Sequence, residues 1–418
     1  MEYIKSKDIY LLTRDILKLI YKWPMDHGSR VAYMVYKMLQ EKGGYEEFEL
    51  ADFVMVATMH DIGAYKTERG RMNDVLRFEN RDTRAHTIYG YLFFKYLSPV
   101  PDLAKIIMYH HMDYEQLQKI DYPYKEVAAY INIAEKMDIY SRAKGSQFDM
   151  KMFQKLSGTK LSPRGLECFY QCQAKYDLFG KIKSGEYKEE LSQIVDYMIY
   201  NNEDKRKFLE MLMYCMGFTS EAMVVDTITT VCICEELANK MMLSPLDKEI
   251  LYYGALIHDI GMLAIPRKII EAPRRLEPDE VNLMRTHVEI AGKELSERMN
   301  NEVVSIALSH HERGDGSGYP LKLKDFQMNT QQKILQVADM VSAMVNKRSY
   351  RPPLSKEQII DILNEDVDKN RLNKQVVTSL LAFYDSIMDR VKKESVEILK
   401  MYQTLNQQYE QVSRKYKI

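Results

Sequence analysis

Hydrophobic residues recur every three or four positions along most of the chain, which is the spacing of an amphipathic α-helix. One such face carries Leu103, Ile106, Ile107, His110 and His111 at i, i+3, i+4, i+7 and i+8. The alternating runs that are typical of strands are scarce. The pattern therefore predicts an all-α protein, with a long polar helix from about residue 380 onward.

The helical pattern occurs twice. The stretch His60-Asp61-Ile62-Gly63 is repeated without change at 258–261, and apolar positions at 103–107 and 303–307 each lead to a His-His pair. An internal repeat of roughly 200 residues predicts two homologous domains. We place the first, with a helical extension, at 1–200 and the second, with the C-terminal helix, at 205–418. The polar run at 201–204 is the preferred boundary.

Composition narrows the class of protein. A chain of 418 residues is longer than a single domain with one hydrophobic core usually is. Its content of 46% hydrophobic and 28% charged residues is normal for a soluble protein. Lys+Arg (59) and Asp+Glu (60) balance, which argues against binding polymeric nucleic acid but allows a local phosphate pocket. There is no 18-residue apolar run, no signal-peptide pattern and no CxxC among five cysteines. We therefore expect a cytoplasmic protein that does not contact membranes.

All nine histidines fall into two parallel series with similar intervals: His27, His60, His86, His110 and His111, then His258, His287, His310 and His311. Imidazoles beside a carboxylate can hold two metal ions, with the carboxylate bridging them. Mixed nitrogen and oxygen ligation suits Fe, Mn, Zn, Co or Ni better than Mg alone. We expect two divalent ions at each complete site.

The first domain offers a complete ligand set: its five histidines, Asp61, and either Glu135 or Asp138 one turn later. A water that bridges two such ions is hydroxide near neutral pH and can attack a phosphorus atom. Asp61, and Asp259 in the repeat, are the predicted catalytic carboxylates. Lys66 either contacts a substrate phosphate or is simply a solvated lysine.

The second domain is incomplete, because residues 221–230 contain no histidine where the first domain has His27. Asp226 could substitute as an oxygen ligand, whereas Thr227 could not replace an imidazole well. The remaining ligands are His258, Asp259, His287, His310, His311 and Asp339. A loop rich in glycine and proline follows the His-His pair, and its position beside metal ligands favours a functional role.

These motifs resemble the HD superfamily of metal-dependent phosphohydrolases. The second half resembles its HD-GYP branch through HDIG at 258–261, HHExxDGxGYP at 310–320 and Val-Ala-Asp339; the first half, about 20–160, resembles a plain HD domain. The resemblance implies a helical core around a binuclear site and hydrolysis of cyclic di-GMP. It also implies substrate-binding roles for Arg313, Asp315, Gly318, Tyr319, Pro320, Arg348 and Arg351.

Departures from the family pattern leave three functions open. The first histidine is missing, and Met262 stands where the family has a lysine that meets substrate phosphate. Alignment of Ile-Ala-Glu135 with Val-Ala-Asp339 favours Glu135 as the terminal ligand. The leading hypothesis is a metal-dependent cyclic di-GMP phosphodiesterase. The alternatives are a degenerate second domain that only binds cyclic di-GMP or a partner, and a phosphohydrolase of another nucleotide that works through the first domain.

The C-terminal helix shows a short heptad pattern at Ile398, Tyr402, Leu405, Tyr409, Val412 and Tyr416. Steps of four and three residues are typical of a coiled coil. The pattern is compatible either with a homodimer through this helix or with a helix that packs on its own domain.

Overall fold

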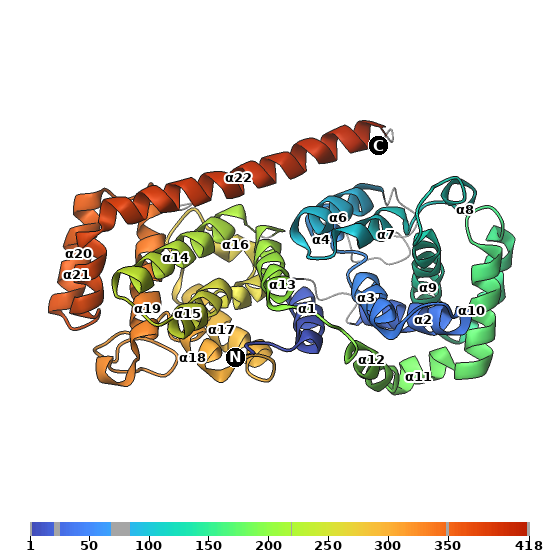
Figure 1. Cartoon of the computed structure of the whole chain (residues 1–418), viewed down its shortest axis with the longest axis horizontal. Helices are drawn as coiled ribbons and strands as arrows, with labels where there is room; N and C mark the ends of the chain where they lie inside the picture. The colour runs from blue at the N-terminus through green and yellow to red at the C-terminus, as the bar shows by residue number, and fades with distance from the viewer. Residues whose placement is uncertain (1, 21–25, 68–83, 219, 348–350, 416–418) are drawn as a thin grey trace. The chain divides into compact units, whose positions relative to one another are not determined.

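The computed structural model describes residues 2–20, 26–67, 84–218, 220–347 and 351–415, and the prediction of an all-α protein is confirmed (Figure 1). Every named element in these ranges is a helix, and only three isolated β-bridges occur among the described residues. Polar side chains begin many of the helices. Ser244, Asn300 and Asn373, for example, each accept a hydrogen bond from a backbone N–H in the first helical turn.

The chain divides into two compact units. The N-terminal unit comprises Ile9–Phe208 with Thr404–Ile418, and the C-terminal unit comprises Leu209–Gln403 with Met1–Asp8. The helices α1 (Ser6–Ile20), α13 (Asn202–Cys215) and α22 (Tyr384–Lys415) contribute residues to both. The domain limits drawn from the sequence, 1–200 and 205–418, stay a prediction.

The N-terminal unit is built around α2 (His27–Lys42), which packs against α3 (Glu47–Thr58) and α9 (Lys125–Lys144). A second pair, α6 (Arg84–Leu97) and α7 (Ala104–Tyr109), also packs together, with α4 (Ala64–Thr67) against α6. Met34, Phe53 and Phe93 are fully buried in this core. The helical extension comprises α8 (Tyr114–Leu117), α10 (Pro163–Tyr176), α11 (Leu178–Ser184) and α12 (Tyr187–Val195).

The C-terminal unit repeats this arrangement. Its central helix α14 (Glu221–Lys240) packs against α15 (Pro245–Ile257) and α19 (Thr330–Val345), as α2 packs against α3 and α9. The unit also contains α16 (Arg267–Ile270), α17 (Pro278–Leu295), α18 (Asn301–Ala307), α20 (Lys356–Asp368) and α21 (Lys374–Ala382). The internal repeat in the sequence therefore appears in the structure as the same order of helices in both units.

The long helix α22 packs against its own chain at heptad positions. Tyr402 and Leu405 are buried, and the Tyr402 hydroxyl donates a hydrogen bond to the carbonyl of Tyr214 at 3.1 Å. The Tyr409 ring lies against Tyr89, with 6.0 Å between ring centroids. The heptad positions at Tyr402, Leu405 and Tyr409 therefore pack within the chain, which is one of the two alternatives that the pattern allowed.

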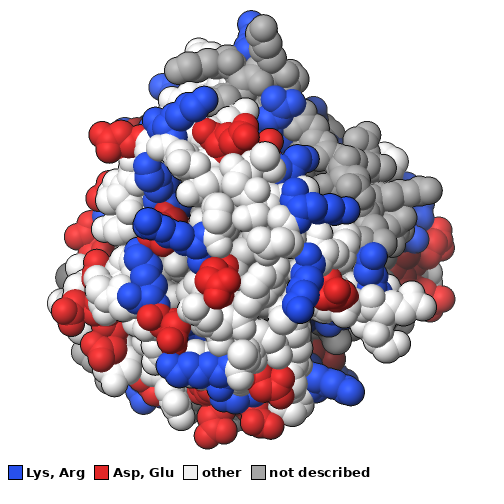
Figure 2. All heavy atoms as spheres, turned by 90° about the vertical axis from the view of Figure 1, so that its right-hand side faces the viewer, with Lys and Arg blue, Asp and Glu red and all other residues white. Residues whose placement is uncertain are grey.

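The charge balance of the sequence is visible on the surface. On the face that Figure 2 shows, Lys and Arg side chains are interspersed with Asp and Glu. Among the described helices, none is long and apolar enough to cross a membrane.

Candidate metal centres

In the N-terminal unit, the predicted ligands converge from five helices. His27 begins α2, His60 and Asp61 follow α3, His86 lies in α6, the His110-His111 pair follows α7, and Glu135 lies in α9. Their ligand atoms form two groups of four, and within each group all atoms lie within 4.8 Å of one another: His27, His60, Asp61 and Glu135, then Asp61, His86, His110 and His111. We call this set the N-terminal centre. Asp61 belongs to both groups.

The two oxygens of Asp61 face different partners. Its Oδ2 lies 3.4 Å from His60 Nε2, while its Oδ1 lies 3.4 Å from His86 Nε2 and 3.7 Å from His110 Nε2. Burial alone would raise the pKa of Asp61, but the surrounding imidazoles hold it well below its ordinary value, so the carboxylate is ionised. This geometry fits a carboxylate that bridges two neighbouring cations.

Helix ends set the tautomers of the histidines. Nδ1 of His60 lies 2.7 Å from the carbonyl oxygen of Ala57, and Nδ1 of His110 lies 2.7 Å from that of Ile107. These carbonyls belong to the last turns of α3 and α7, where intrahelical partners run out. Because a carbonyl only accepts, Nδ1 must carry the proton, which leaves the Nε2 lone pair for another partner.

The Nε2 atoms of His60, His110 and His111 are buried and have no hydrogen-bond partner among the described residues. Unpaired polar atoms in a protein interior are costly, so this pattern fits bound metal. Burial lowers the pKa of His60 to about 3 and that of His86 to about 4, which keeps both imidazoles neutral at pH 7. Neutral imidazoles are the form that binds metal ions.

Glu135 lies among the ligands of the N-terminal centre, whereas Asp138 contacts one of those ligands from outside. Glu135 is fully buried within the first ligand group, and its Oε1 lies 3.5 Å from His111 Nε2. Asp138 accepts from His27 Nδ1 at 2.7 Å and from Arg30 at 2.6 and 2.8 Å. It therefore orients His27 from behind, and of the two acids that the sequence left open, Glu135 is the one grouped with the other ligands.

The glycine of each HDIG motif allows two segments to approach closely. A Cβ atom on Gly63 would lie 2.0 Å from the carbonyl oxygen of His86, and one on Gly261 would lie 2.0 Å from that of His287. No side chain fits at such distances. The glycines thus let the His-Asp turn pack against the helix that carries the next ligand.

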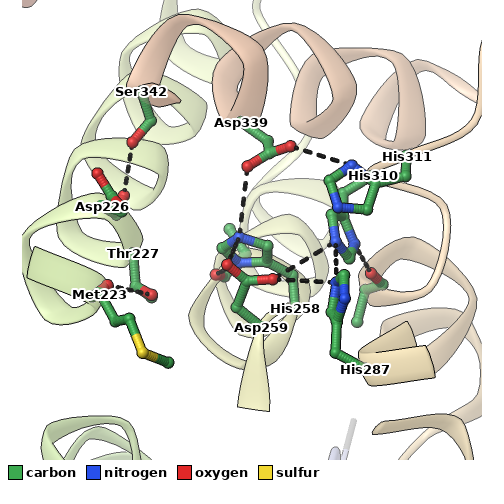
Figure 3. A network of polar contacts seen from close by, with 12 residues as sticks. Met223, Asp226, Thr227, His258, Asp259, His287, His310, His311, Asp339 and Ser342 are labelled. Carbon is green, nitrogen blue, oxygen red and sulfur yellow. Dashed lines mark hydrogen bonds and ion pairs between the residues drawn. The ribbon is translucent and has the colours of Figure 1, made fainter. Parts of the chain in front are cut away.

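The C-terminal centre has the same frame with one ligand fewer (Figure 3). Asp259 Oδ2 lies 3.5 Å from His258, and its Oδ1 lies 3.3 Å from His287 and 3.6 Å from His310. Asp339 lies 3.5 Å from His311 and 3.8 Å from His258. Among the described residues, the closely spaced ligand group here is His287, His310 and His311.

Asp226, the predicted substitute ligand, is held by neighbouring side chains. Its Oδ1 accepts a hydrogen bond from Asn346 at 2.8 Å, and its backbone carbonyl accepts one from Ser342. The buried Thr227 hydroxyl donates to the carbonyl of Met223 (Figure 3). Asp226 lines the same cavity as Asp259 and Asp339 but does not belong to the close ligand group, so its role as a ligand stays a prediction.

The C-terminal centre is the more open of the two. His311 is 26% exposed where His111 is 7% exposed, and Asp339 is 18% exposed where Glu135 is fully buried. A cavity of about 860 Å³ lies over Asp259, His287 and Asp339. This volume can admit a nucleotide-sized ligand.

A buried carboxylate holds the loop after the His-His pair. Glu312 has no exposed surface, and its two oxygens accept hydrogen bonds from the backbone N–H groups of Leu321 at 2.6 Å and Leu323 at 2.8 Å. The Gln336 side chain donates to the Glu312 carbonyl. Met112 stands at the matching position of the first domain and cannot make these bonds.

Only some of the predicted substrate-binding residues line a cavity in the structure. Arg313, Gly318 and Tyr319 line a smaller cavity beside His311. Asp315 accepts from Ser317 within the loop, Pro320 is exposed, and Lys66 is half-buried in α4.

Arg351 and Arg348 were predicted to bind substrate as well. The Arg351 guanidinium donates to the carbonyls of Ala343 and Met344 at the end of α19, which is typical of a helix cap, so the structure does not bring it to the cavity. Arg348 lies outside the described residues.

Comparison with known families agrees with this duplicated arrangement. Two family models, both described as HD domain, match residues 25–143 and 211–376. Both halves of this chain are HD domains. The predicted tandem of HD domains is therefore confirmed.

Two relatives of the tandem HD protein have named activities. The 3'3'-cGAMP-specific phosphodiesterase 1 of Vibrio cholerae is 24% identical over 386 residues, which cover 84% of this chain and 85% of that protein. The cyclic di-GMP phosphodiesterase of Thermotoga maritima is 34% identical over 165 residues, 38% of this chain and 44% of that protein. The chain thus spans most of the first relative and less than half of the second.

A solved structure shares the fold of the tandem HD protein. A cyclic GMP-AMP-specific phosphodiesterase of V. cholerae superposes with a TM-score of 0.60 at 13% identity, over 92% of this chain and 98% of that one. Sequence reasoning missed Arg30 and Glu312 as supports. Neither belongs to a ligand group, Arg30 acts through Asp138, 108 residues away, and Glu312 acts through backbone N–H groups, which leave no signal in the sequence.

Proposed function

We propose that this tandem HD protein is a metal-dependent phosphodiesterase that hydrolyses a cyclic dinucleotide. The observation that carries the proposal is the pair of four-ligand groups that share Asp61. The names of the two relatives, one acting on 3'3'-cGAMP and one on cyclic di-GMP, support a cyclic dinucleotide as the substrate class.

We assign the chemistry to the N-terminal HD domain, because its ligand set is complete. Two divalent ions, when bound there, would polarise a phosphate and supply a nucleophilic hydroxide near neutral pH. The residues of the chain hold that site ready. Asp61 stays ionised between the two groups, and the buried imidazoles stay neutral with their Nε2 atoms directed inward.

We assign dinucleotide recognition to the C-terminal HD domain. Its ligands are the more exposed, its loop is held by Glu312, and the cationic side chains of Arg275 and Lys347 line its cavity. Its three-histidine group is sufficient for one metal ion.

Two further assignments belong to the proposal. A cytoplasmic location is proposed from the five cysteines, which are all free thiols. A homodimer through α22 would use outward-facing residues such as Leu399, 41% exposed, because Tyr402 and Leu405 are buried within the chain.

The test is hydrolysis of cyclic di-GMP and of 3'3'-cGAMP in Mn²⁺-supplemented buffer, followed by chromatography of the products. Wild type, Asp61→Ala, Asp259→Ala and, as a matched control, the exposed acid variant Asp121→Ala are compared. We expect turnover to be lost in Asp61→Ala at every substrate concentration, kept in Asp121→Ala, and kept in Asp259→Ala at saturating substrate. Loss only in Asp259→Ala would move the chemistry to the C-terminal domain, and no turnover by wild type would refute the proposed activity.

A further inference from the structure

A second cavity, of about 360 Å³, opens beside the C-terminal centre. Three arginines line it: Arg285 from α17, Arg313 from the loop, and Arg371 from the segment between α20 and α21. Asp366 is the one acidic residue in the described lining. The cavity therefore carries an excess of positive charge, which suits an anionic ligand.

Two of the three guanidinium groups have no acidic partner within the part of the chain that the structure describes. Arg371 lies 3.3 Å from Asp366 and 3.4 Å from Asp315, so its charge is largely matched. Arg285 and Arg313 form no ion pair with any described residue; Arg313 makes only a long 3.4 Å hydrogen bond to the Glu312 carbonyl. Planar guanidinium groups without a carboxylate are well suited to bind phosphate oxygens in pairs.

Tyr319 forms the wall between this cavity and the metal centre. Its ring lies 4.8 Å from the His311 ring, and the Arg285 guanidinium lies 5.2 Å from its centroid. Tyr319 and His311 line both the smaller cavity and the larger one over Asp259. The contact with Arg285 is a cation–π interaction, which holds the arginine at the mouth of the cavity.

We propose that the arginine cavity binds the second phosphate of a cyclic dinucleotide whose first phosphate lies at the C-terminal metal centre. The inference rests on the proposed function for the class of ligand but not on hydrolysis in either domain. Both phosphates of such a molecule belong to one small ring, so two anion sites separated by a single side chain can hold them together. Arg285 and Arg313 then act in recognition, although neither is a metal ligand.

The experiment measures binding in a chain in which the N-terminal chemistry is silenced. Cyclic di-GMP is titrated calorimetrically into full-length Asp61→Ala protein with Mn²⁺, and then into the same protein with Arg285→Gln or Arg313→Gln added. Arg267→Gln is the matched control, because this exposed arginine pairs with Glu271 and lines neither cavity. Circular dichroism and metal content establish that each variant is folded.

We expect Arg285→Gln and Arg313→Gln each to weaken binding at least about tenfold, since each removes a charge-assisted contact to phosphate. Arg267→Gln should bind as the parent does. Equal affinity in all the variants, or no binding by the parent, would overturn the inference. GMP, which has a single phosphate, is titrated into the same variants. Weaker binding of GMP but not of cyclic di-GMP in the arginine variants would reject the dinucleotide assignment. None of these results depends on turnover, so a failure of the proposed activity remains distinguishable.

Discussion

Removal of Asp138 should damage the N-terminal centre without removing a ligand. Asp138 and Arg30 are 2% and 4% exposed, and their two contacts are 2.6 and 2.8 Å long. Asp138→Ala would remove the carboxylate that the buried Arg30 guanidinium contacts, and breaking a buried pair in this way typically costs about 3–5 kcal/mol. His27 would also lose the acceptor that orients its ring, which should weaken metal binding about 10–100-fold.

A double variant separates these two effects. Arg30→Met with Asp138→Leu removes both buried charges, so most of the lost stability should return, while metal affinity should stay low. Stability is measured by urea unfolding of metal-free protein, and affinity by Mn²⁺ titration in the Asp259→Ala background. Ser342→Ala is the control, because Ser342 follows Asp339 by one turn as Asp138 follows Glu135. Unfolding within 1 kcal/mol of wild type together with unchanged Mn²⁺ affinity in Asp138→Ala would refute this reasoning.

Two further predictions concern single positions. Gly63→Ala should abolish metal binding in the N-terminal domain only, and Gly261→Ala in the C-terminal domain only, because each added Cβ would meet a carbonyl oxygen at 2.0 Å. Metal content is measured for Gly63→Ala in the Asp259→Ala background and for Gly261→Ala in the Asp61→Ala background. Equal loss of metal from both domains would contradict this prediction. Glu312→Gln should destabilise the loop at 313–323 by about 1–3 kcal/mol, because one of the two accepting oxygens becomes an amide nitrogen, which only donates. Faster amide exchange in this loop than in the exposed variant Glu297→Gln is the expected result, and unchanged protection would count against it.

Helical periodicity and histidine spacing were sufficient to predict the all-α fold and the residues that form the close ligand groups, because both reflect local rules. A ligand that follows the last turn of a helix appears in sequence as an apolar face ending in His-Asp or His-His. The repeat also favoured Glu135 over Asp138, since Glu135 aligns with Asp339. In the structure, Glu135 is indeed the acid in the ligand group.

Supports of the ligands could not be predicted in this way. Arg30 and Asp138 are 108 residues apart, and a buried ion pair leaves no periodic signal in either segment. Glu312 precedes the loop residues that were predicted to bind substrate, yet it is fully buried and binds backbone N–H groups. Arg351 likewise has the residue type of a phosphate ligand, but its guanidinium binds the end of α19. Residue type and position alone do not distinguish these roles.

In the proposed function, the two HD domains have different roles. The N-terminal centre has every ligand but lacks the Glu312-type support for a recognition loop, since Met112 occupies that position. The C-terminal centre has the loop, the open cavity and the arginines, but it lacks the ligand that corresponds to His27. If binding and chemistry are separated in this way, Asp61→Ala should abolish turnover with little effect on cyclic di-GMP affinity. Arg285→Gln should weaken cyclic di-GMP affinity and leave the metal content of the N-terminal centre unchanged, because each substitution changes residues of one centre only.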